Sequence, residues 1–138
     1  MINKIAYGTY YFLFDKIYDN DFILSQEWYK VKQPNKIFYA MEEMIIKSIE
    51  KGIRIFDTAK WYKTEDVLGR AIKRAIDRNL VKRKDLTIIT KLDYYGLEEV
   101  ENDIVLIHSP VRNNIKNTWQ ELDLLVKNGK IKEIGISN

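Results

Sequence analysis

The chain has 138 residues, a size typical of a single domain, and its 46% hydrophobic and 31% charged residues are ordinary for a globular protein. It has no cysteine and one histidine, which excludes disulfides, thiolate catalysis, cysteine-ligated zinc and a histidine-rich metal site. The net charge of +3 is spread along the chain, without the dense basic stripe of a nucleic-acid-binding protein. Because the sequence shows neither a signal peptide nor an apolar run of membrane-spanning length, we expect a cytoplasmic protein with neither nucleic acid nor membrane as a partner.

The first part of the chain predicts a strand, a long irregular segment and a helix. Residues 4–10 can form the strand, and residues 11–35 are aromatic and match no periodic pattern. Asn35 is placed to cap a helix over residues 36–51, which Gly52 ends. The apolar positions of this helix follow a helical period: Ile37, Ala40, Met41, Met44, Ile45 and Ile49.

The middle of the chain predicts a strand, a helix and a second strand. Residues 53–56 form a short strand that ends at Asp57, and Thr64 can cap a helix over residues 65–78. The continuous apolar run at 86–90 is typical of a buried parallel strand and ends at Lys91. The inward stripe of the helix comprises Val67, Leu68, Ala71, Ile72, Ala75 and Ile76.

The last part predicts strand, helix and strand again. Residues 104–107 form an apolar strand that ends at His108. Asn117 or Thr118 opens a helix that runs to about residue 128 and ends at Gly129. Residues 131–136 form the final strand, followed by Ser137 and Asn138.

This alternation predicts a parallel sheet with helices outside it, in a single domain over residues 1–138. Four strands end on a polar residue, namely Asp57, Lys91, His108 and Ser137. In a (β/α)₈ barrel the C-terminal edge of the sheet is the catalytic face, and a doubly wound sheet places its site there too. No Gly-x-Gly-x-x-Gly turn follows a strand, which argues against a Rossmann nucleotide site.

Each candidate residue has an ordinary structural alternative when taken alone. Asp57 could cap a turn, Tyr62 could be a packed aromatic, Lys91 an exposed strand end and His108 a loop histidine. The functional interpretation is preferred because all four residues converge on one edge of one sheet.

Carbonyl reduction is the chemistry that needs this set of groups. A hydride added to a carbonyl carbon leaves charge on the oxygen, which must then be protonated. A tyrosine is a weak acid at neutral pH, and a nearby lysine cation favours its phenolate and makes it a better acid. We therefore assign Tyr62 as the acid, Lys91 as the cation beside it and Asp57 as the carboxylate that holds Lys91. His108 would orient the carbonyl oxygen or share in proton delivery.

The sequence resembles the aldo/keto reductase family in several motifs that occur in the right order. Residues 52–59 (Gly-Ile-Arg-Ile-Phe-Asp-Thr-Ala), followed by Tyr62 and Glu65, resemble the first signature of that family. Residues 81–91 resemble the approach to its catalytic lysine, and residues 106–110 (Leu-Ile-His-Ser-Pro) resemble its histidine strand. The same order continues through Thr118-Trp119, Gly129-Lys130-Ile131 and residues 134–138 (Ile-Gly-Ile-Ser-Asn), and Gly8-Thr9-Tyr10 resembles the first strand.

The resemblance implies a (β/α)₈ TIM barrel, NADPH as cofactor, a small carbonyl substrate, and Asp57, Tyr62, Lys91 and His108 as catalytic residues. Ser137 and Asn138 would hold the nicotinamide carboxamide. The implied cofactor-binding set is Gly8, Thr9, Tyr10, Asp57, Ser137 and Asn138, with no metal.

Two departures from the family shape the expected fold. The link from Leu92 to Asp103 holds only twelve residues, so the third helix of the barrel should be shortened. The last three strand-helix units of the family, which grip the adenosine phosphates, would lie beyond Asn138. We therefore predict a partial barrel of about five parallel strands in an incomplete domain. As an alternative to the reductase, the chain could be an inactive truncated remnant or an interaction module that self-associates through its exposed sheet face.

Overall fold

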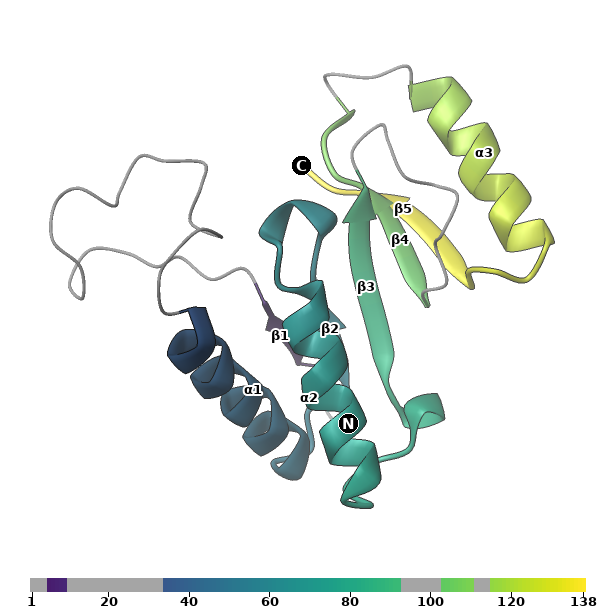
Figure 1. The fold of residues 1–138 in the computed structure, drawn as a ribbon. Helices are drawn as coiled ribbons and strands as arrows, with labels where there is room; N and C mark the ends of the chain where they lie inside the picture. Colours follow the sequence, from purple (N-terminus) through teal and green to yellow (C-terminus); the bar gives the residue numbers. More distant parts are fainter. Residues whose placement is uncertain (1–4, 10–33, 93–102, 111–114) are drawn as a thin grey trace, which may run out of the picture.

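The computed structural model describes residues 5–9, 34–92, 103–110 and 115–138, which alternate between strands and helices (Figure 1). The β-strands are β1 (Ala6–Gly8), β2 (Ile55–Asp57), β3 (Thr87–Leu92), β4 (Ile104–Ile107) and β5 (Glu133–Ile136). The α-helices are α1 (Pro34–Glu50), α2 (Glu65–Asp77) and α3 (Ile115–Lys127), and the short 3₁₀ helices are η2 (Lys60–Tyr62) and η3 (Arg83–Asp85). No helix in these ranges combines the length and apolar character needed to cross a membrane.

The strands form one parallel sheet in the order β1-β2-β3-β4-β5, which confirms the predicted partial barrel. Neighbouring strands are in register at Phe56 and Ile88, and again at Lys91 and Leu106. Partnered residues of a parallel sheet point to the same side, and successive residues of one strand point to opposite sides. The register therefore assigns each strand residue to one of two sheet faces.

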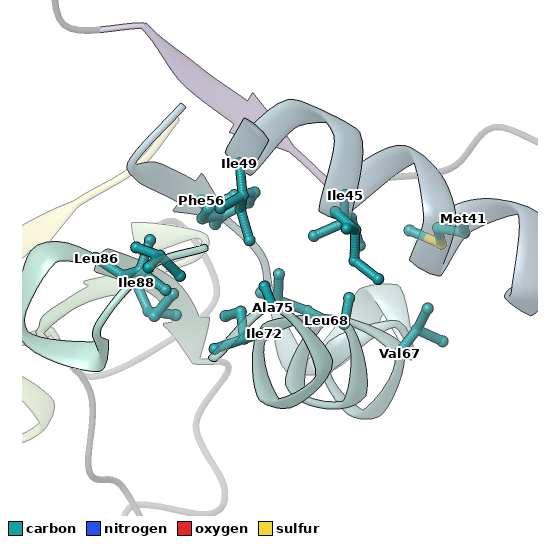
Figure 2. Packing of buried hydrophobic residues seen from close by; sticks show 13 residues of the cluster. Met41, Ile45, Ile49, Phe56, Val67, Leu68, Ile72, Ala75, Leu86 and Ile88 are labelled. Atoms are coloured by element: carbon teal, nitrogen blue, oxygen red, sulfur yellow. The ribbon is translucent and has the colours of Figure 1, made fainter. Parts of the chain in front are cut away.

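The helices pack on one of these faces. Figure 2 shows Ile45 and Ile49 of α1 facing Leu68 and Ala75 of α2, with Phe56 of β2 beside them. A second cluster joins α3 to β4 and β5, and it contains Leu92, Val105, Ile107, Leu122 and Ile131. Because Ile88 and Leu92 of β3 share one side of the strand, both clusters cover the same sheet face. We call the opposite face, which carries Asp57 and Lys91, the inner face.

The predicted inward stripe of α2 is confirmed, but that of α1 is partly wrong. On α1, Ala40 and Met44 are exposed, whereas Ile46 and Glu42 are buried. Glu42 is only 4% exposed because two arginines of α2 reach it, with Arg70 Nε at 2.6 Å and an Arg74 nitrogen at 3.1 Å. The bond to Glu42, followed by that to Asp66, raises the pKa of Arg70 above its ordinary value. The packed face of α1 thus includes a charged residue, which the pattern of apolar residues alone does not predict.

Two predicted helix starts are also wrong. Helix α1 begins at Pro34, so Asn35 lies inside it, and α3 begins at Ile115, so Asn117 and Thr118 lie in its first turns. Proline suits a first helical position because its missing N–H would have no partner there. In α3, Thr118 is buried rather than placed at the helix boundary.

The predicted helix ends are confirmed at Gly52 and Gly129, which have φ of 94° and 71°. The Gly129 N–H donates to the Val126 carbonyl and the Lys130 N–H to the Leu125 carbonyl, so these two carbonyls in the last turn of α3 are satisfied. Helix α2 closes with the same pattern, but Asn79 takes the left-handed position with φ of 58°. Strand β3 runs past its predicted end and includes Lys91. The predictions for residues 11–33 and for the shortened third helix at 93–102 lie outside the described residues.

Candidate active site

The four predicted catalytic residues come together at the C-terminal ends of β2, β3 and β4. Asp57 is the last residue of β2, Lys91 is the penultimate residue of β3, and His108 directly follows β4. The register places Asp57 opposite Ile89 and Lys91 opposite Leu106, so these side chains project from the inner face. Tyr62 ends η2, the loop helix that follows β2. Three neighbouring strands and one loop therefore build the site.

Asp57 and Lys91 form the tightest contact in this group. Lys91 Nζ lies 2.5 Å from Asp57 Oδ1 and also donates to the Thr58 carbonyl oxygen at 3.1 Å. Only 8% of Lys91 is exposed, and a buried ammonium group requires such partners because it has lost its hydration. The two acceptors fix the cation at the end of a long, otherwise flexible side chain.

Tyr62 lies beside both Lys91 and His108. Lys91 Nζ is 4.9 Å from the centroid of the Tyr62 ring. The His108 ring lies 5.8 Å from the Tyr62 ring, centroid to centroid, and the two planes meet edge to face at 81°. The Tyr62 ring thus has the Lys91 ammonium group and the His108 imidazole as neighbours.

The loop that carries Tyr62 is held at both ends. At its start the Thr58 N–H donates to the Ile89 carbonyl at 2.8 Å, and within it the Tyr62 N–H donates to the Ala59 carbonyl at 2.9 Å. At its end Lys63 adopts a left-handed conformation with φ of 55°, which turns the chain into α2. Ala59, in the middle of the loop, is fully buried.

Thr64 occupies the predicted boundary position of α2, but the prediction that its side chain caps the helix is wrong. The structure gives no side-chain cap at this position. The Thr64 hydroxyl instead lies 3.2 Å from both the carbonyl oxygen and the hydroxyl of Thr9, at the end of β1. A contact with the residue that follows β1 thus takes the place of the local capping bond.

The residues predicted to bind the cofactor lie around the same edge, with different surroundings. Gly8 pairs with Asp57, and a Cβ atom added to it would meet no atom of the described part of the chain within 4 Å. Thr9 is buried, and both its N–H and its hydroxyl donate to the Asp57 carbonyl, at 2.8 and 3.2 Å. Its side chain thus supports β2. Tyr10 lies outside the described residues.

Ser137 and Asn138, the other two residues predicted to bind the cofactor, converge on His108. The Ser137 hydroxyl donates to the His108 carbonyl at 2.9 Å, and the Asn138 amide donates to the same oxygen at 2.8 Å. Asn138 is exposed. These bonds join the end of β5 to the site.

Thr58 is a contributor that sequence reasoning missed. It holds Lys91 through its main-chain carbonyl, and main-chain acceptors leave no trace in residue type. Its own hydroxyl is buried and has no hydrogen-bond partner among the residues that the structure describes. In the ranges that the structure describes, no group of three acidic or histidine side chains could hold a metal ion.

Sequence comparison finds a matching family model and several similar proteins. Residues 39–102 match the model of the aldo/keto reductase family. The NAD(P)H-dependent D-xylose reductase of Scheffersomyces stipitis is 33% identical over an alignment that covers 70% of this chain and 43% of that enzyme. An uncharacterized oxidoreductase of Bacillus subtilis, YtbE, is 30% identical, with 80% and 44% covered. The chain therefore spans less than half the length of these relatives.

Solved structures show the same likeness. An aldo-keto reductase complexed with NADPH superimposes with a TM-score of 0.67 over 96% of this chain and 43% of that one, at 23% identity. A Bombyx mori aldo-keto reductase in complex with NADP gives a TM-score of 0.63 at 26% identity, covering 78% of this chain. The five-stranded sheet and its helices thus correspond to part of the fold of these reductases.

Proposed function

Because the chain belongs to the aldo/keto reductase family, we propose that it catalyses the NADPH-dependent reduction of an aldehyde or ketone. The observation that carries this proposal is the convergence of Tyr62, Lys91 and His108 at one sheet edge, with the Lys91 ammonium held by Asp57. The cofactor part of the proposal is supported by relatives described as NAD(P)H-dependent and by a structural neighbour complexed with NADPH.

In this proposal Tyr62 is the proton donor. When bound, NADPH supplies a hydride to the carbonyl carbon of the substrate. Tyr62 gives its phenolic proton to the carbonyl oxygen, and the Lys91 ammonium stabilises the resulting phenolate. Asp57 and the Thr58 carbonyl keep that ammonium beside the ring, so little reorganisation is needed when charge develops. His108 orients the carbonyl oxygen toward Tyr62.

The groups at the end of β5 suit the nicotinamide. A carboxamide has both a donor and an acceptor, and Ser137 and Asn138 offer hydroxyl and amide groups of both kinds. Their side chains lie at the His108 carbonyl, next to the catalytic residues. They are the residues of this chain that would hold the carboxamide.

A titration of the purified chain with NADPH tests the proposal. We expect the cofactor fluorescence to change and to saturate, and Asn138→Leu to weaken the binding because it removes an amide partner. Asp77→Asn is a matched control, since Asp77 lies in an exposed i,i+4 pair with Lys73 on α2. A folded chain that leaves millimolar NADPH unchanged would contradict the proposal.

The inner face supports a second candidate function, which is self-association as an interaction module. All three helices of the described ranges pack on the other face, whereas parallel sheets are normally covered on both sides. The inner face carries four half-buried aliphatic residues: Ile55, Ile89, Ile104 and Leu106.

Light scattering after size exclusion tests this second candidate. We expect a mass above that of one chain, and we expect Leu106→Glu to shift the population toward the monomer because it places a charge in the apolar contact. Met44→Glu is the control, since Met44 lies on the exposed side of α1. A monomer that unfolds cooperatively at all accessible concentrations would argue against an interaction module.

A further inference from the structure

We propose that Glu65 and Thr90 form a positioning pair that sets the Tyr62 loop against His108 and Lys91. The Thr90 hydroxyl donates to Glu65 Oε1 at 2.6 Å, which joins the first residue of α2 to β3. The contact itself is a property of the fold. Its consequence for catalysis rests on the proposed function.

The topology connects this pair to the position of the Tyr62 loop. The loop leaves the sheet at the end of β2 and re-enters regular structure at α2. Strand β2 lies between β1 and β3 in the sheet, and the start of α2 is bonded to both of these neighbours. Thr64 bonds to Thr9 at the end of β1, and Glu65 bonds to Thr90 on β3. The far end of the loop is therefore fixed relative to three adjacent strands.

The chemistry of the pair makes this a firm attachment. Thr90 is only 2% exposed, and a buried hydroxyl without an acceptor is destabilising. A hydrogen bond from a hydroxyl to a carboxylate is shorter and stronger than one to a neutral acceptor. Thr90 also directly precedes Lys91, so the residue that anchors the loop lies on the strand that carries the lysine.

A general preference for acids in the first helical turn does not account for this contact. Both Glu65 and Asp66 lie in the first turn of α2 and both favour the positive end of the helix dipole. Asp66, however, bonds to Arg70 on the exposed side of the same helix. Asp66→Ala therefore removes an equivalent charge from the same turn without touching the loop anchor, which makes it the matched control for Glu65→Ala.

The single histidine of the chain provides a direct measurement. The His108 ring protons give one assignable set of NMR signals, and the adjacent Tyr62 ring shifts them because its circulating electrons create a local field. Tyr62→Leu defines the signal positions without that ring. We expect Glu65→Ala and Thr90→Val to move the His108 signals toward the Tyr62→Leu positions. Thr90→Ser, which keeps the hydroxyl, and Asp66→Ala should leave them in place.

The outcomes separate this proposal from the proposed function. The measurement needs neither NADPH nor turnover, so a chain without reductase activity can still show the positioning effect. If Thr90→Val fails to fold, Glu65→Ala decides the question, because Glu65 is exposed and its truncation leaves no buried hole. A folded Glu65→Ala chain whose His108 signals coincide with those of the unmodified chain would overturn the proposal.

Discussion

Replacing Tyr62 by phenylalanine is expected to lower carbonyl reduction by about 10²- to 10⁴-fold, the range that a positioned proton donor contributes. The substitution removes one oxygen and keeps the ring, so the edge-to-face contact with His108 should persist. The loss should appear in kcat at saturating NADPH, because in the proposed mechanism the phenol acts on the substrate oxygen in the transition state. The measurement is NADPH oxidation with an aldehyde substrate, together with the urea midpoint of unfolding.

Tyr39→Phe is the matched control for this experiment. Tyr39 lies on α1 and is 63% exposed, so the same change of atoms occurs on an exposed helix position that is not among the four candidate catalytic residues. It should leave both turnover and stability unchanged. Retention of full turnover by the Tyr62→Phe chain would exclude Tyr62 as the acid and would direct attention to His108, whose ring lies beside that of Tyr62.

The location of the candidate site could be predicted because the sheet brings distant residues to one edge. Asp57, Lys91 and His108 each lie at the end of an apolar run, and parallel pairing aligns such ends. Tyr62 lies beyond the end of β2, and η2 places its ring beside His108 and Lys91. The catalytic roles of these four residues remain predictions.

Features set by competition between partners could not be predicted. The Thr64 hydroxyl could bond to its own helix or to Thr9, and the choice depends on where β1 ends in space. Glu42 is buried against two arginines of α2, Arg70 and Arg74. These arginines lie 28 and 32 residues further along the chain. A periodic pattern in one helix contains no information about such partners.

Asp103 is another buried charged residue whose partners a local sequence pattern does not reveal. We expect its contacts to give the largest stability effect outside the site. It directly precedes β4 and is only 5% exposed. Its carboxylate contacts Lys132 Nζ at 2.6 Å, an Arg83 nitrogen at 2.9 Å and the Ile88 N–H at 2.9 Å. Its main-chain carbonyl accepts from the N–H groups of Lys132 and Glu133. One residue therefore joins β3, β4 and the start of β5.

Removing this carboxylate by Asp103→Ala should lower the free energy of unfolding by about 1–3 kcal/mol, mainly because the buried Ile88 N–H loses its acceptor. The two cations contribute less, because the Lys132 and Arg83 side chains are 70% and 46% exposed and can be rehydrated. Asp103→Asn keeps an acceptor for the Ile88 N–H and should cost less. Urea unfolding measures the difference, with Asp77→Ala as an exposed control that is expected to cost well under about 1 kcal/mol.

The contribution of Asp103 should also depend on pH. Burial by itself raises the pKa of this carboxyl, but the bonds from Lys132, Ile88 and Arg83 outweigh it and hold the pKa below its ordinary value. A group with a lowered folded pKa stabilises the fold fully above its unfolded pKa, near about 3.9 for aspartate. That stabilisation is lost as the pH falls below this value through the folded pKa, because the unfolded chain then binds the proton more readily. Asp103→Asn removes this titration, so its unfolding midpoint should fall less steeply in acid than that of the unmodified chain. Equal acid dependence in the two chains would show that other carboxylates set the acid limit of the fold.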